Sequence, residues 1–205
     1  DIFRRYLEAL DGNRQFFTAA DIARFEPHRM AMGDAVRKGD PAAAFAIFAV
    51  YRERVEQRVA YARKLLGQDF DFTGQERWDY DREEAPWAAD GAALDALWRK
   101  SVMNDWLRLK IAGKQPAEIR KTLDKRYQQI ARSVNEIKSE DVFALFLNAY
   151  TSSVDPHTDY LNPRSAENFN QSMSLSLEGI GAQLQRQDDK ASEPTWRGTL
   201  MLRLP

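Results

Sequence analysis

Residues 40–67 read DPAAAFAIFAVYRERVEQRVAYARKLLG, and this stretch indicates the fold class more clearly than any other. It predicts one long helix, with Asp40 as the N-terminal cap and Pro41 at the first position, where a missing N–H costs nothing. Gly67 is the predicted stop. The apolar side chains recur at steps of three and four residues and therefore share one face of the helix. They are Phe45, Phe48, Val55, Val59, Ala62 and Leu66.

Helical periodicity dominates the chain as far as about residue 154. Further helices are expected over residues 2–10, 18–37 and 91–112, from Pro116 onward, from a cap at Ser139, and from 162 to about 172. The segment VFALFL at 142–147 is apolar nearly all round, so we expect it at the centre of the bundle. Residues 174–177 instead alternate polar and apolar side chains, which is the period of a strand. We therefore predict a mostly α protein, in which a multi-helix region is followed by a β segment.

Composition excludes several classes of function. The net charge is −1, so no global field favours nucleic acid or an anionic membrane, and no apolar run is long enough for a transmembrane helix. The tryptophans have no basic patch interleaved with them and do not predict a nucleic-acid surface. There is no cysteine, which excludes disulfides, thiolate nucleophiles and cysteine-ligated zinc. The first residues already look helical and do not resemble a signal peptide.

We call residues 67–90 the acidic aromatic loop, because they hold eight carboxylates against two arginines, together with five aromatic rings. We expect the rings to hold the loop across the helices. Its DFDFTG segment at 69–74 matches the start of an EF-hand calcium loop, including the glycine. The twelfth position, which should be a bidentate glutamate, is Tyr80. A structural loop is therefore favoured over a calcium site.

The two histidines, His28 and His157, are too few for a histidine-rich metal site. His28 follows Pro27 at a predicted helix start and is interpreted as a cap or surface residue. His157 lies in the sequence DPHT at 155–158, where Asp155 can accept a hydrogen bond from the turn backbone and Thr158 can do likewise. A catalytic role would need an aligned serine, and no glycine-flanked elbow marks one. Turn architecture is favoured over catalysis.

The segment Gly179-Ile180-Gly181 is a candidate binding loop. Glycines leave backbone N–H groups unshielded and permit positive φ, so several N–H groups can converge on a carboxylate. An adjoining strand edge can pair with the backbone of a peptide. A lone G-x-G is also common in bulges and tight turns, so the pattern by itself leaves both interpretations open.

These residues carry a resemblance to a known family. The segments DPHTDYLNPR at 155–164, FN at 169–170 and MSLSLEGIGA at 173–182 resemble the tail-specific proteases, the periplasmic carboxyl-terminal processing proteases of Gram-negative bacteria. Shorter segments are similar to the N-terminal helical domain of that family: DFTG at 71–74, APW at 85–87, ALW at 96–98, RY at 126–127 and SEDVF at 139–143. The resemblance covers about residues 2–189.

The resemblance implies a bowl-shaped periplasmic serine endopeptidase without a cofactor. Its helical domains form the walls, a PDZ domain senses protein carboxyl termini, and a serine–lysine dyad hydrolyses the substrate, the lysine being kept neutral by its surroundings. The implied partners are proteins with apolar carboxyl termini, the PDZ, protease and C-terminal helical domains of the parent, and an adaptor lipoprotein. The implied PDZ carboxylate loop is Gly179, Ile180, Gly181 and Ala182. The implied joint between helical wall and PDZ domain is Asp155, Pro156, His157, Thr158 and Tyr160.

The resemblance also predicts what this chain lacks. We expect a helical domain over residues 1–173, the first strand and carboxylate loop of a truncated PDZ domain over 174–189, and an atypical tail over 190–205 that does not resemble the family. The catalytic serine and lysine map onto no residue here, so the chain is predicted to be an inactive scaffold fragment. The alternative is a stand-alone helical interaction domain that docks a partner through the acidic aromatic loop.

Overall fold

The computed structural model describes residues 2–174, 182–186 and 196–200, which divide into two compact units after Tyr160. The helices of the first unit are α1 (Ile2–Asp11), α2 (Ala19–Phe25), α3 (His28–Lys38), α4 (Ala42–Leu65), α5 (Gly91–Ile111), α6 (Pro116–Asn135) and α7 (Ser139–Val154). The second unit contains α8 (Pro163–Ser174), β1 (Ala182–Arg186) and β2 (Trp196–Leu200). The predicted mostly α fold is confirmed.

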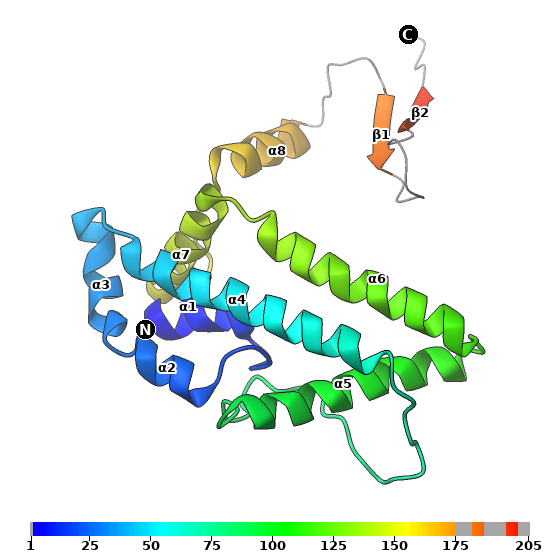
Figure 1. Ribbon diagram of the computed structural model, residues 1–205. Helices are drawn as coiled ribbons and strands as arrows, with labels where there is room; N and C mark the ends of the chain where they lie inside the picture. The colour runs from blue at the N-terminus through cyan, green and yellow to red at the C-terminus, as the bar shows by residue number, and fades with distance from the viewer. Residues whose placement is uncertain (1, 175–181, 187–195, 201–205) are drawn as a thin grey trace. The chain divides into compact units, whose positions relative to one another are not determined.

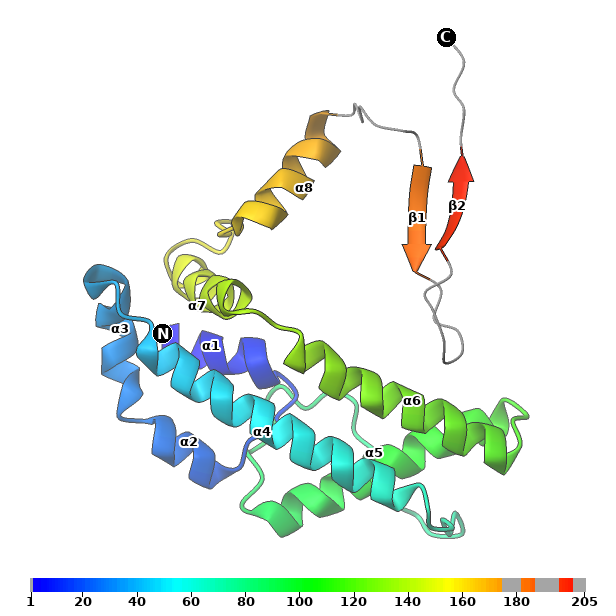
Figure 2. The ribbon, with the colours of Figure 1, turned by 45° about the horizontal axis from the view of Figure 1, so that its top comes forward.

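Helix α4 is the centre of the first unit (Figure 1). It packs against α1, α3, α5, α6 and α7, and α5 and α6 also pack against each other. Helix α1 lies between α3, α4 and α7 in the same network of contacts. Turning the molecule shows α4 running between α5 and α6 along much of its length (Figure 2).

The apolar face predicted for α4 is confirmed. Val55 and Ala62 are fully buried, Phe48, Val59 and Leu66 are nearly so, and Phe45 is half-buried. Burial of each larger apolar side chain contributes about 1.5–3 kcal/mol. The predicted cap is wrong by one residue, because α4 begins at Ala42 with Pro41 at the N-cap position and no side chain caps it. Asp40 instead accepts the N–H of Ala42 at 3.1 Å, a turn contact just before the helix.

Two further helix predictions are wrong in detail. The single helix expected over residues 18–37 is two helices that meet at Pro27, because proline lacks an N–H and its ring crowds the preceding turn. Ser139 is the first residue of α7 rather than its cap. The reason is that Asp141, two residues further on, reaches back and accepts the N–H of Lys138 at 3.0 Å.

The expected central position of residues 142–147 is also wrong. Val142 and Phe146 are buried, but the four other side chains of this segment are only half-buried. Helix α7 packs against α1 and α4 and so lies at the side of the bundle, while α4 occupies its centre.

The second unit begins with α8, where Asn162 accepts the N–H of Ser165 at 2.8 Å and Pro163 occupies the first turn, as the sequence predicts. Strands β1 and β2 pair antiparallel, with Ala182 opposite Leu200 and Arg186 opposite Trp196. Of the strand expected over 174–177, Ser174 ends α8 and the rest lies outside the described residues. The domain boundary expected between 173 and 174, and the atypical tail 190–205, stay predictions.

Candidate functional site

The acidic aromatic loop joins α4 to α5 and is held to the helices by its rings, as the sequence predicts (Figure 1). Phe70 packs edge-on against Trp106 of α5, with 5.5 Å between ring centroids, and Phe72 lies 6.2 Å from Phe70. The ammonium of Lys110 sits 5.1 Å from the centre of the Phe72 ring. The first part of the loop is therefore attached along one side of α5.

Polar contacts extend this attachment. Arg120 of α6 donates to the carbonyl oxygen of Leu66 at 2.9 Å and to the carboxylate of Asp69 at 3.0 Å. Further along, Glu76 forms an ion pair with Arg99 of α5. The Tyr80 hydroxyl donates to Oδ1 of Asn104 at 2.8 Å. Both α5 and α6 therefore hold the loop.

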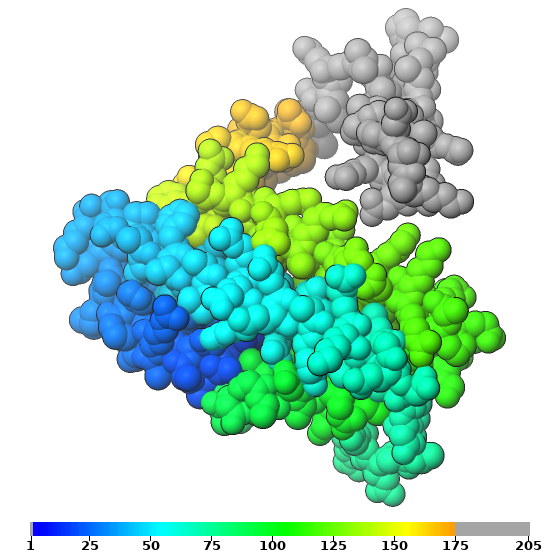
Figure 3. Space-filling model, in the orientation of Figure 1, coloured from blue at the N-terminus to red at the C-terminus, as the bar shows by residue number. Residues whose placement is uncertain are grey.

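The end of the loop is attached to the connection between α1 and α2. Trp87 packs against Phe17 at 6.1 Å, and the guanidinium of Arg14 lies 5.2 Å from the Trp87 ring while donating to the carbonyl oxygen of Ala85. The N–H of Ala19 also donates to Ala88 at 2.8 Å. The loop stands out from the helices in the space-filling view (Figure 3), yet it is fixed at its start, middle and end.

A hollow of about 460 Å³ lies between the loop and α5. The loop contributes residues between Gln68 and Trp78, and α5 contributes one face, which consists of Arg99, Lys100, Met103, Asn104 and Leu107. The neighbouring face of α5 carries the buried residues Trp98, Val102 and Trp106. One helix thus presents its apolar side to the core and a mixed polar and apolar side to the hollow.

The carboxylates around the hollow are already engaged. Asp69 pairs with Arg120, and Glu76 pairs with Arg99. Asp71 accepts the N–H of Thr73 at 2.9 Å and its hydroxyl at 2.7 Å, and these hydrogen bonds hold the pKa of Asp71 below its ordinary value. Within the described residues, no group of three or more His, Cys, Asp or Glu side chains converges as metal ligands would. Within the EF-hand-like pattern at 69–74, Asp71 and Thr73 thus form a hydrogen-bonded turn.

The Asp155 segment forms the turn expected from its sequence. Asp155 accepts the N–H of His157 at 3.0 Å and the hydroxyl of Thr158 at 2.9 Å. These bonds lower the pKa of this exposed carboxyl. The side chain of Asn148 in α7 then holds both backbone groups of Tyr160, accepting its N–H at 2.6 Å and donating to its carbonyl oxygen at 3.1 Å.

This turn is therefore a structural element. The Tyr160 ring also packs edge-on against Phe143, with 6.1 Å between centroids. Pro156 and His157 are exposed. The role of the segment as a joint to a PDZ domain stays a prediction. Gly179, Ile180 and Gly181 lie outside the described residues, and Ala182 is the first residue of β1.

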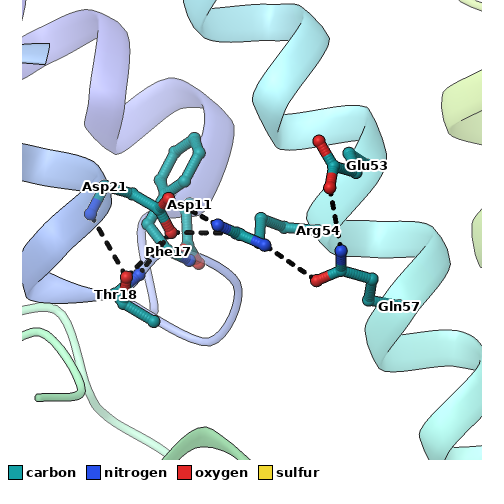
Figure 4. Close-up of polar contacts among 7 residues, drawn as sticks. All are labelled: Asp11, Phe17, Thr18, Asp21, Glu53, Arg54 and Gln57. Atoms are coloured by element: carbon teal, nitrogen blue, oxygen red, sulfur yellow. Dashed lines mark hydrogen bonds and ion pairs between the residues drawn. The ribbon is translucent and has the colours of Figure 1, made fainter. Parts of the chain in front are cut away.

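A buried ionic cluster was missed by sequence reasoning (Figure 4). Asp21 of α2 is bound by Arg54 of α4 at 2.7 and 2.9 Å and by the backbone and hydroxyl groups of Thr18. Burial works to raise the pKa of Asp21, but the hydrogen bonds from Arg54 and Thr18 outweigh it and hold the pKa below its ordinary value. The spacing of the N-cap Thr18 and of Asp21 in the first turn of α2 signals a capping box, but it does not signal the contact with Arg54.

Asp11 is a second buried carboxyl near this cluster. It accepts the N–H groups of Gln15, Phe16 and Phe17 at 2.7–2.9 Å. Burial raises the pKa of Asp11, although these three bonds oppose the rise. Asp11 and Asp21 are only 3% exposed, so they organise the turn between α1 and α2 and offer no surface to a ligand.

Comparison with known proteins gives one consistent result. Residues 1–164 match the family described as the tail-specific protease N-terminal domain. The chain is also 39% identical over 192 residues to the tail-specific protease of Haemophilus influenzae. That alignment covers 93% of this chain and 28% of the relative, so the chain spans little more than a quarter of that protein's length. None of the described helices is long and apolar enough to cross a membrane.

Proposed function

The chain belongs to the tail-specific protease family, within which it corresponds to the N-terminal domain, and from this membership we propose that it is the scaffold and substrate-chamber wall of a serine endopeptidase that acts on protein carboxyl termini. One observation supports this role above all others. The residues matched by the family contain the whole helical unit, which ends at Tyr160. The matched residues are therefore a coherent structural element and fit the role of a wall.

Hydrolysis is assigned to parts of the parent protein outside these 205 residues. We propose a serine–lysine dyad in which the lysine, neutral in its surroundings, accepts the serine proton. Gly179 to Ala182 are proposed as the carboxylate-binding loop of a PDZ domain, and Asp155 to Tyr160 as the joint that precedes it. The parent is proposed to work in the periplasm on proteins with apolar carboxyl termini and to use an adaptor lipoprotein.

The contribution of this chain is positional. Helix α4 packs against five other helices, and the Asn148 amide fixes the backbone of Tyr160 at the point where the first unit ends. A wall of this kind keeps its shape when a substrate binds against it, because closely packed side chains resist deformation.

A chimera tests this function. Residues 1–164 of this chain replace the matching segment of the Haemophilus influenzae tail-specific protease, and cleavage of a protein with an apolar carboxyl terminus is followed by electrophoresis. We expect the chimera to cleave and the isolated 205-residue chain to leave the substrate intact. The matched control is the same chimera with the recipient's nucleophilic serine replaced by alanine. A folded chimera without cleavage, or cleavage by the isolated chain, would contradict the proposal.

A stand-alone interaction domain is the second candidate, and the hollow beside the acidic aromatic loop is the observation that favours it. In this case the loop would dock a partner protein independently of any protease. A chimera that cleaves normally after residues 70–84 are exchanged for a glycine–serine linker would favour the interaction domain. Loss of cleavage in a chimera that still folds would favour the wall.

A further inference from the structure

The hollow beside α5 contains hydrogen-bond donors that the protein does not use. In the described part of the chain, neither the Arg77 nor the Lys100 side chain forms an ion pair or hydrogen bond, whereas the three carboxylates of the lining are engaged internally. Arginine and lysine side chains can donate but not accept. The free groups of the hollow therefore suit a ligand that supplies acceptors and negative charge.

Asn104 adds a donor of the same kind. Its Oδ1 accepts the hydroxyl of Tyr80 at 2.8 Å, which fixes the orientation of the amide and leaves its NH₂ group to donate. Asn104 lies one helical turn after Lys100 on the face of α5 that lines the hollow. Two cations and an amide NH₂ thus belong to one small region.

The lining also includes apolar side chains, beside its three engaged carboxylates, Arg99 and Gln68. Met103 and Leu107 come from the same face of α5, and Phe70 and Phe72 come from the loop. An apolar group that covers them is removed from water, which favours binding. An inorganic anion would use only the donors, and an aliphatic molecule would use only the apolar part. A carboxylate attached to an apolar group uses both.

The hollow is also formed before any ligand arrives. Its walls are joined by the packing of Phe70 on Trp106, by the ion pair of Glu76 with Arg99, and by the contact of Tyr80 with Asn104. A preformed site avoids the free-energy cost of ordering side chains and loops on binding. Its volume of about 460 Å³ falls in the range of ligand pockets.

We propose that this hollow is an accessory site for the carboxyl terminus of a protein ending in an apolar residue. The terminal carboxylate binds between Arg77 and Lys100, and the last side chain lies on Met103 and Leu107. That the ligand is a substrate tail rests on the proposed function, whereas the requirement for an apolar carboxylate rests on the hollow alone. The site is separate from the carboxylate loop proposed at Gly179 to Ala182.

Fluorescence anisotropy of the 205-residue chain tests the site. The probe is a labelled peptide ending in Leu-Ala-Ala with a free carboxyl, compared with the same peptide as its C-terminal amide. We expect saturable binding of the free acid and at least a tenfold weaker binding of the amide. The double variant Arg77→Met and Lys100→Met should weaken binding of the free acid about tenfold or more.

Two controls keep the test specific. Lys121→Met and Arg132→Met together remove the same charges from exposed positions of α6 and should leave binding unchanged. Circular dichroism verifies that both double variants fold. Equal binding of acid and amide, unchanged binding in the Arg77 and Lys100 variant, or competition by inorganic phosphate as strong as by the unlabelled peptide would each overturn the proposal. The chimera can cleave normally in all these cases, so failure of the site and failure of the proposed function are distinguishable.

Discussion

The acidic aromatic loop is irregular but packs closely on other segments, whereas α8 is a regular helix without a buried side chain among its described residues. Residues 67–90, all of them described, contain neither helix nor strand, yet rings, ion pairs and backbone bonds attach them to α5, α6 and the turn before α2. Helix α8 is regular over twelve residues, yet none of these described residues is buried. Its Phe169 and Met173 are exposed by 52% and 66%. Contacts between residues distant in sequence, rather than local hydrogen bonding, therefore fix the acidic aromatic loop to the helices.

The largest expected difference in the free energy of unfolding is between a substitution under the loop and one on the exposed face of α8. Trp106→Ala should lower the free energy of unfolding by roughly 3–5 kcal/mol, because it leaves a cavity in the core and removes the ring under Phe70. Phe169→Ala should change it by less than about 0.5 kcal/mol. Urea denaturation followed by circular dichroism measures both. Equal losses of stability in the two variants would contradict the expected difference between the loop anchor and α8.

A smaller loss of stability is expected when a buried carboxylate is neutralised, and a still smaller one for an exposed carboxylate. Asp21→Asn should cost roughly 1.5–3 kcal/mol at neutral pH, because charge-assisted hydrogen bonds to Arg54 and Thr18 are weakened. The folded-state pKa of Asp21 is lowered, so its stabilisation is present above the ordinary pKa near 3.8 and is lost as pH falls through the folded-state pKa. The variant should therefore lose less stability on acidification than the original chain does.

The matched control for this prediction lies in the acidic aromatic loop. Asp71 also has a lowered pKa, but its carboxyl is exposed and, among the described residues, accepts hydrogen bonds from Thr73 alone. Asp71→Asn should change the acid dependence less than Asp21→Asn. Denaturation midpoints between pH 2 and pH 7 measure the difference, and a larger change for Asp71 would be the contrary result.

A weaker effect is expected from one ion pair of the loop. Glu76→Gln should cost roughly 0.2–1 kcal/mol, because both side chains of its pair with Arg99 are about two-fifths exposed and water screens them. The cost should shrink at 1 M salt, where the attraction is screened in the original chain as well. Urea denaturation at low and high salt tests this. Glu118→Gln, which removes the exposed ion pair of Glu118 with Lys114, is a matched control outside the lining of the hollow and should show a cost of similar size.

The smallest effect concerns removal of α8 and everything after it. A chain ending at Asn162 should unfold at nearly the same urea concentration as the full chain, within about 0.5 kcal/mol, because no described residue of α8 contributes a buried side chain. A loss of several kcal/mol would show that α8 or the residues after it stabilise the helical unit.

Sequence reasoning worked where the signal is local and failed where it is not. The apolar stripe of α4, the start of α6 at Pro116 and the cap at Asn162 follow from spacing and from backbone chemistry within one turn. The ionic cluster of Asp21 and Arg54 joins two helices, so neither residue signals it alone.

The hollow beside α5 shows the same limit. The rings of the loop predict that it is anchored, but they do not predict which face of α5 it covers. That face is set by the pairing of Phe70 with Trp106 and of Glu76 with Arg99, contacts between different segments of the chain. The composition shows that the loop is acidic. Only the structure shows which carboxylates of the hollow are bonded within the protein and which cationic side chains are not.

The central claim is that a segment without helix or strand is a fixed part of the helical unit and so forms a permanent hollow. Backbone ¹⁵N order parameters measure this most directly. The account predicts values near 0.85 for residues 70–80, equal to those of α4 and α5. Values below about 0.6 across these residues would show a flexible loop and would contradict both the anchoring and the preformed site.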